Sequence, residues 1–140
     1  MYKILNKTFS KLPTEAQEQQ ELVNWLKKNN YFYFATNNEN NQSFSNRLIA
    51  MKIEQKSKAM GKIKGTPDLC IFTENTIVFI ELKRQRPILK SGKLGKATND
   101  ATIEQIDFIA KANDYKYAYG VVAYGCDESI KILRSFSSKK

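Results

Sequence analysis

The sequence contains no histidine. This absence excludes histidine-ligated zinc sites, Ser–His and Cys–His nucleophile pairs, and the nuclease classes that depend on histidine. Cysteine is also scarce, because Cys70 and Cys126 are the only two and form no CxxC pair, which argues against zinc bound by thiolates and favours a reduced chain. No apolar run is long enough to span a membrane, and residues 1–13 lack the apolar segment of a signal peptide. We therefore expect a cytoplasmic protein with no membrane partner.

Negative charge is in short supply as well. The chain has 23 Lys and Arg residues against 14 Asp and Glu residues, a formal net charge of +9. Residues 46–96 hold 12 of the basic and 4 of the acidic side chains, so nearly all of the excess lies in this segment. A concentrated basic field attracts polyanions, and nucleic acid is the most obvious one. A generic solvated surface is the alternative.

Two acidic residues and a lysine stand out within this basic segment. Residues 76–83 are predicted to form a strand, and residues 68–72 are predicted to pair with it through a short turn. Alternation places Glu81 and Lys83 on one face of the strand, and a hairpin of this length brings Asp68 beside Glu81. The opposite face carries the apolar residues Val78, Ile80 and Leu82.

The chemistry of this set indicates phosphodiester hydrolysis. Two carboxylates held close together repel unless a cation or a proton lies between them, and Mg²⁺ is commonly held by one or two carboxylates. A nearby lysine can orient water or stabilise negative charge in a transition state. Two other interpretations remain open, because Gly65–Asp68 is also a good turn sequence, and Glu81 and Lys83 could form an exposed charged strip on an edge strand.

Four stretches of the sequence resemble the VRR-NUC family of the PD-(D/E)XK nuclease superfamily, whose small stand-alone members occur in phages and bacteria. These are Gly65-x-Pro67-Asp68-Leu69, Glu81-Leu82-Lys83, the Thr102-x-x-Gln105 pair at a helix start, and the acidic helix that begins near Glu15. The resemblance covers roughly residues 13–125. The resemblance implies that the protein is located in the cytoplasm of a bacterial or phage-infected host cell.

The resemblance also implies roles for individual residues. Asp68 and Glu81 would bind Mg²⁺ or Mn²⁺ together with the main-chain carbonyl of Leu82, and Lys83 would position or activate the water. The acid of the first helix is best assigned to Glu15.

Two assignments stay open. Glu18 is the second choice for the first-helix acid, whereas Glu21 lies off the shared face of the helix. Gln105 faces the catalytic centre, completes a capping box with Thr102, or does both in part.

The order of elements predicts an α/β fold in one domain, residues 1–140. It is a three-layer αβα arrangement with a small mixed central sheet, as in restriction endonuclease-like PD-(D/E)XK proteins. Residues 2–9 are expected to be a tail or a short strand. The other expected elements are helices over 13–28, 47–60, 102–113 and 127–133, strands over 31–36, 68–72, 76–83 and 117–124, and a loop over 37–45.

Two basic segments flank the acidic pair. Gly61–Gly65 is a cationic segment bounded by glycines, which lets a phosphate backbone approach closely. Residues 84–97 form a basic loop, for which DNA binding and a disordered surface loop are about equally favoured. The candidate DNA-binding residues are Lys62, Lys64, Arg84, Arg86, Lys90, Lys93 and Lys96.

The sequence therefore predicts a Mg²⁺- or Mn²⁺-dependent DNA endonuclease. The family resemblance implies branched substrates, such as four-way junctions or flaps, and a homodimer. A non-catalytic DNA-binding module on a nuclease fold is the main alternative, and an interaction protein whose basic face meets an acidic partner is another.

Overall fold

The computed structural model describes residues 1–36 and 46–136. The loop expected over 37–45 lies outside these residues. The centre of the fold is a four-stranded mixed sheet in the order β3-β4-β5-β6, in which only the β5–β6 pair is parallel. Its strands are β3 (Phe32–Ala35), β4 (Leu69–Phe72), β5 (Ile77–Lys83) and β6 (Ala118–Tyr124).

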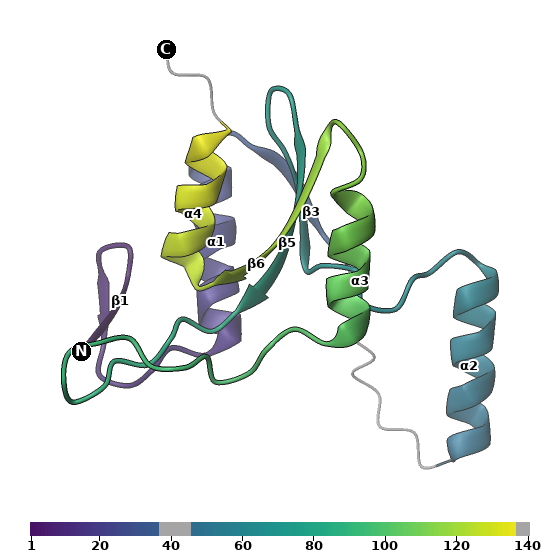
Figure 1. Ribbon diagram of the computed structural model, residues 1–140, viewed down its shortest axis with the longest axis horizontal. Helices are drawn as coiled ribbons and strands as arrows, with labels where there is room; N and C mark the ends of the chain where they lie inside the picture. The colour runs from purple at the N-terminus through teal and green to yellow at the C-terminus, as the bar shows by residue number, and fades with distance from the viewer. Residues whose placement is uncertain (37–45, 137–140) are drawn as a thin grey trace.

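Helices cover both faces of this sheet. Helices α1 (Glu15–Lys28) and α4 (Cys126–Ser135) lie on one face, and α3 (Ile103–Ala112) lies on the other (Figure 1). The prediction of an αβα fold around a small mixed sheet is therefore confirmed. The face under α1 and α4 holds the hydrophobic core, which includes Leu22, Leu26, Leu69, Ile71, Val78, Ile80, Leu82, Ile130 and Leu133.

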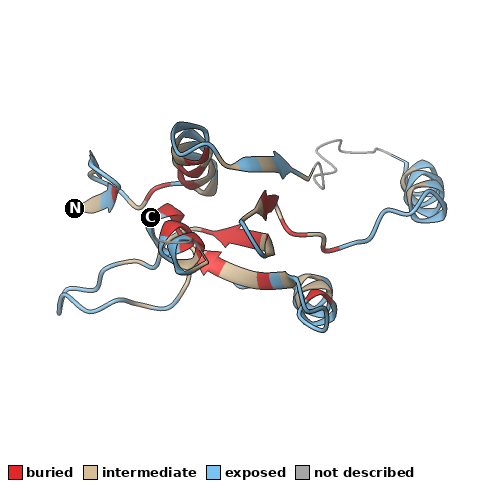
Figure 2. Cartoon of the chain, turned by 90° about the horizontal axis from the view of Figure 1, so that it is seen from above, coloured by how far each residue is buried: buried red, intermediate tan, exposed pale blue. Residues whose placement is uncertain are grey.

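The α3 face is only partly covered. Phe108 of α3 packs edge-on against Phe79 of β5, with ring centroids 5.5 Å apart. Gly120 of β6 lets the helix approach closely, since a Cβ at this position would lie 3.2 Å from the Cα of Ile109. Helix α3 thus packs over β5 and β6. Figure 2 shows that burial is concentrated in β4, β5 and the helix faces that contact the sheet, whereas β3 is largely exposed.

Side-chain caps fix where two of these helices begin. The hydroxyl of Thr14 accepts a hydrogen bond from the backbone N–H of Gln17, whose side chain accepts one from the backbone of Thr14. Thr102 and Gln105 form the same reciprocal pair at α3. Each box satisfies two helix-end donors.

The N-terminal residues are more ordered than the sequence predicts. Strands β1 (Tyr2–Ile4) and β2 (Lys7–Phe9) form an antiparallel hairpin, with Leu5 at a φ of +54° in the turn. Ile4 is fully buried, and the backbone N–H of Leu5 donates to Asp127 at the start of α4. The hairpin is therefore anchored to the far end of the chain.

Helix α2 (Arg47–Ala59) stands apart from the sheet, beyond α3 (Figures 1 and 2). None of its residues is buried, although it carries apolar side chains such as Leu48 and Ile49. Across the described residues, no helix combines the length and apolarity needed to cross a membrane.

Candidate active site

The register of the hairpin brings Asp68 and Glu81 together. Leu69 of β4 pairs with Ile80 of β5, so the positions one step further along the two strands are Asp68 and Glu81. The backbone N–H of Leu82 donates to Oδ2 of Asp68 over 2.8 Å, which fixes this carboxylate against β5. Figure 1 shows that the end of β5 lies near the starts of α1 and α4.

Lys83 completes a buried charged group. Its Nζ lies 3.5 Å from Oε2 of Glu81, and the two residues are 7 % and 2 % exposed. Strand β5 is also an interior strand, between β4 and β6. The alternative of an exposed charged strip on an edge strand is therefore wrong. Burying such charges is costly unless they are compensated, and functional sites are where this cost is commonly found.

The carboxylate of Glu81 lacks a sufficient positive partner. Burial and the neighbouring Asp68 carboxylate raise the pKa of Glu81 to about 8, although Lys83 opposes the shift. Oε1 of Glu81 is buried and has no hydrogen-bond partner among the residues that the structure describes. An unsatisfied hard oxygen beside a second carboxylate fits a divalent cation such as Mg²⁺.

Any such ion would have few protein carboxylates. Within residues 1–36 and 46–136, no three His, Cys, Asp or Glu side chains group closely enough to hold a metal ion. The first-helix acids therefore do not form a compact three-acid cluster with Asp68 and Glu81. Asp68 and Glu81 supply two carboxylates, and Mg²⁺ is commonly held by one or two carboxylates together with water.

Glu18 was the second choice for the first-helix acid at the ion site, and in the structure it has a structural role. It is fully buried, and Oε1 accepts a hydrogen bond of 2.9 Å from the backbone N–H of Cys126, the first residue of α4. Oε2 accepts bonds from the side chain and the backbone of Gln85, at 2.9 and 3.3 Å. Glu18 thus joins three segments and satisfies a donor at the start of α4, where negative charge is favourable.

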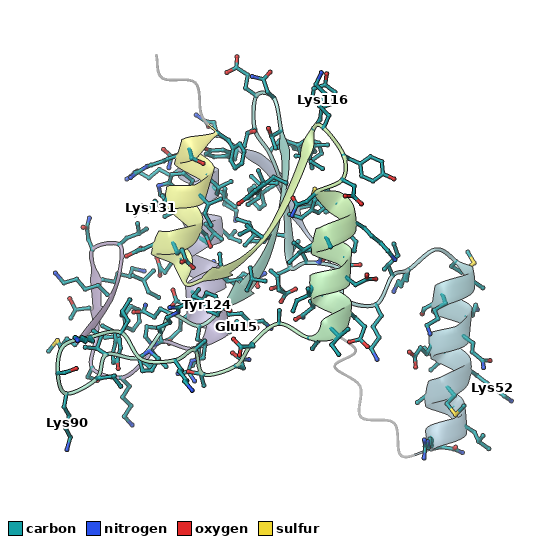
Figure 3. The ribbon with its side chains drawn as sticks, viewed as in Figure 1. Glu15, Lys52, Lys90, Lys116, Tyr124 and Lys131 are labelled. Carbon is teal, nitrogen blue, oxygen red and sulfur yellow. The ribbon has the colours of Figure 1, made fainter. Side chains whose placement is uncertain are left out.

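Glu15 lies one turn earlier on the same helix face and is half-buried. Figure 3 labels it near the end of α1 that faces the loop after β5. Glu21 points elsewhere, because it pairs with Lys7 over 2.6 Å. The geometry favours Glu15 over Glu18 as the first-helix acid, and its role remains a prediction.

We expect Glu18→Ala to destabilise the fold, because it removes the acceptor of three hydrogen bonds and leaves the buried N–H of Cys126 unpaired. The cost should be about 3 kcal/mol or more of unfolding free energy. Glu15→Ala should change stability much less but weaken divalent-ion binding. Thermal unfolding with and without Mg²⁺ measures both effects. Equal destabilisation by the two variants would contradict this division.

Gln105 does form the capping box with Thr102, through bonds of 2.8 and 3.2 Å. Its helix start packs directly on the segment that leads into Asp68, because a Cβ on Gly65 would lie 2.4 Å from the carbonyl carbon of Glu104. Gly65 also has a φ of +87°, which glycine adopts without strain. A second role for Gln105 at the catalytic centre stays a prediction.

The basic residues divide into two arginines that contact other parts of the fold and five exposed lysines. Arg84 donates from Nε to the carbonyl of Pro13 and from Nη2 to that of Leu12, so it joins the end of β5 to the start of α1. Arg86 lies over the ring of Tyr124, 5.0 Å from its centroid. The lysines are exposed, and Figure 3 shows Lys90 at the outer end of the loop after β5. DNA contacts by this set, Lys62, Lys64, Arg84, Arg86, Lys90, Lys93 and Lys96, stay predictions.

The loop after β5 is more structured than an irregular surface loop. Ile88 and Leu94 form a β-bridge, and the backbone of Gly95 donates to the carbonyl of Pro87 over 2.7 Å. An open hollow of about 500 Å³ lies between this loop and Asp100. Its lining includes Arg86 and Lys96, which gives it a basic wall.

Tyr124 is a site neighbour that the sequence did not single out. It ends β6, opposite Lys83 in the parallel register, and its hydroxyl lies 3.3 Å from Oδ1 of Asp100. Burial and the Asp100 carboxylate raise the pKa of Tyr124, so its hydroxyl stays protonated and donates. The parallel pairing of β5 with β6 is the signal that would have placed it there.

Comparison with known proteins agrees with this geometry. No protein-family model and no curated protein matches the sequence. Among solved structures, the fold is similar to that of a VRR_NUC domain protein, with a TM-score of 0.58 and 25 % sequence identity. The similarity covers 90 % of this chain and 89 % of that one. The resemblance indicated by the Asp68, Glu81 and Lys83 motifs is thereby confirmed, and the chain has the fold of the VRR-NUC family of nucleases.

Proposed function

We propose that the chain is a Mg²⁺- or Mn²⁺-dependent DNA endonuclease. The observation that carries this proposal is the buried Glu81 carboxylate, whose Oε1 has no hydrogen-bond partner within residues 1–36 and 46–136 although Asp68 and Lys83 lie beside it. Such a group is energetically costly in the fold and becomes favourable when a divalent cation binds.

Asp68 and Glu81 would hold the ion. Oδ2 of Asp68 is held by the backbone N–H of Leu82, and the Asp68 carboxylate lies close enough to Glu81 to raise its pKa. The N–H and C=O of one residue in an extended strand point to the same edge, so the Leu82 carbonyl also faces the Asp68 side. Glu15 would assist from the first turn of α1. When bound, the ion would lower the pKa of water and neutralise charge on the phosphate.

Lys83 would act on the nucleophile or on the phosphate. Its ammonium is buried, close to Glu81 and on the same side of β5. A lysine in this position can orient the attacking water, or stabilise the extra negative charge of the pentacovalent phosphate. Gln105 lies at the start of α3, which packs on Gly65 just before Asp68, and from there it would support the site.

The substrate proposal rests on charge and on family resemblance. The excess of positive charge in residues 46–96 favours a polyanion, and the exposed lysines around the site would contact its phosphates. We further propose that branched DNA is preferred and that the protein acts as a homodimer, because symmetric cutting of a four-way junction requires two sites.

The proposal is tested by incubating the protein with a labelled duplex, single strand, flap and four-way junction in Mg²⁺, Mn²⁺ or EDTA. We expect metal-dependent cutting that is strongest on the branched substrates and is lost in Asp68→Ala. Light scattering of the protein alone and of its junction complex measures the stoichiometry. Junction binding without cutting in either metal would instead support the non-catalytic DNA-binding module.

A further inference from the structure

Three phenylalanines form an exposed aromatic patch on the sheet. Phe32 and Phe34 of β3 are 69 % and 48 % exposed, and the half-buried Phe72 of β4 pairs directly with Phe32. The ring centroid of Phe72 is 5.0 Å from that of Phe32 and 6.5 Å from that of Phe34. Exposing such large rings is unfavourable unless a ligand covers them. We call Phe32, Phe34 and Phe72 the aromatic patch.

The aromatic patch lies on the same face of the sheet as the acidic pair. Phe34 pairs with Cys70, and Cys70 pairs with Phe79, so these three side chains share one face. Glu81 is two residues beyond Phe79, which keeps it on that face. Helix α3 covers this face over β5 and β6, and leaves the rings of β3 open.

The distance from the patch to the acidic pair suits a polymer that occupies both. The backbone of Thr36 donates to the carbonyl of Asp68, so the end of β3 lies beside this residue. Phe34 is two residues back along β3 and Phe32 is four, which corresponds to about 7 and 13 Å of strand. The patch therefore begins next to the carboxylates and extends away from them along the strands.

The charges around the patch favour nucleic acid. Neither β3 nor β4 contains a charged residue, and the segment that leads into Asp68 carries the exposed Lys62 and Lys64. Aromatic rings and a basic segment that both adjoin Asp68 form a combination that suits single-stranded nucleic acid, because bases can stack on the rings while cations contact the backbone. Bases in a duplex already stack on one another, so the ligand must be unpaired.

We propose that the aromatic patch binds unpaired bases of the DNA strand that enters the carboxylate site. This inference rests on the proposed nuclease function, because that function is what places the DNA strand in the carboxylate site. It narrows the substrate to DNA with a single-stranded stretch beside the cut, as in a flap or an open branch. The patch supplies stacking energy, and Lys62 and Lys64 supply phosphate contacts.

The test is binding of labelled oligo-dT and of a duplex of equal length, by fluorescence anisotropy in EDTA so that no DNA is cut. Phe34→Leu keeps apolar bulk but removes the ring, whereas Phe34→Tyr keeps the ring and is the matched control. We expect Phe34→Leu to lose about tenfold in affinity for oligo-dT and less than about twofold for the duplex. Its salt dependence should not change, because no phosphate contact is lost. Phe32→Leu should behave in the same way.

Several results would overturn the inference. Equal loss for oligo-dT and duplex, or no loss for either, would show that the ring does not bind unpaired bases. A second copy of the chain is the competing occupant, since α2 also exposes apolar side chains, among them Leu48 and Ile49. Dissociation of a dimer in Phe34→Leu, seen by light scattering without a change in oligo-dT affinity, would assign the patch to that copy.

Parallel cleavage assays separate this inference from the proposed function. If Phe34→Leu binds oligo-dT normally and the parent still cuts a flap, the stacking inference fails and the nuclease proposal stands. If the parent cuts nothing but the ring is required for oligo-dT binding, the stacking inference stands without the nuclease.

Discussion

Replacing Glu81 by glutamine is expected to abolish DNA cleavage and, at the same time, to stabilise the metal-free protein at pH 8. The amide has almost the size of the carboxylate, so packing is preserved. The substitution removes the cost of burying a charge and the repulsion from Asp68, which are the causes of the raised pKa of Glu81. It also removes a proposed ion ligand, so cleavage in Mg²⁺ should fall by about 10²–10³-fold or more.

The pH dependence of stability provides a second measurement of the same group. The pKa of Glu81 is about 8 in the fold against an ordinary value of 4.5, so the folded protein binds this proton more tightly than the unfolded chain does. Stability from this group is therefore fully present below about pH 4.5 and is lost as the pH rises towards 8. Each unit of pKa difference corresponds to about 1.4 kcal/mol.

Thermal unfolding in EDTA between pH 5 and pH 8 measures this dependence. We expect the Tm of the parent to fall towards pH 8 and that of Glu81→Gln to fall less, so that the variant is higher by about 5 °C at pH 8. Mg²⁺ should raise the Tm of the parent at pH 8. The rise should be smaller at pH 5, because a proton then competes with Mg²⁺ for the Glu81 carboxylate. Mg²⁺ should not raise the Tm of Glu81→Gln. Glu54→Gln is the control, because Glu54 is exposed and makes only a 3.9 Å surface pair. Identical pH profiles for parent and Glu81→Gln would contradict the assignment.

Much of this site could be predicted because its signals are local. Glu81 and Lys83 share a face by alternation along a single strand, and a short turn returns Asp68 to the neighbouring strand. The same alternation placed the apolar residues Val78, Ile80 and Leu82 together on the opposite face, and all three are fully buried. Helix starts at Thr14 and Thr102 follow from side chains three residues apart.

The parts that were not predicted depend on contacts between distant segments. Glu18 looked like a possible ion ligand because it shares a helix face with Glu15, but its partner Cys126 lies 108 residues further along the chain. The hydrogen bonds of Arg84 were not predicted either, because its Nε and Nη2 reach carbonyls 71 and 72 residues earlier in the chain. No local pattern encodes such pairings, since they arise only when the helices pack on the sheet.

Replacing Lys83 by methionine is expected to reduce cleavage by about 10³-fold while ion binding is retained. Methionine fills a similar volume in a buried position, so the fold should persist. The ammonium that lies 3.5 Å from Glu81 disappears, and with it the group proposed to orient water or stabilise charge on the phosphate. The carboxylates remain, so Mg²⁺ should still raise the Tm at pH 8.

Two further variants separate the possible roles of Lys83. Lys83→Arg keeps the positive charge, so partial recovery of cleavage would favour charge stabilisation, whereas complete loss would favour a specific part in positioning water. Lys64→Met is the matched control, because Lys64 is exposed in the segment before Asp68. It should weaken DNA binding and lower the salt slope by about one unit without reducing the cleavage rate at saturating DNA. Full cleavage by Lys83→Met would exclude a chemical role for this lysine and leave the carboxylates as the essential groups.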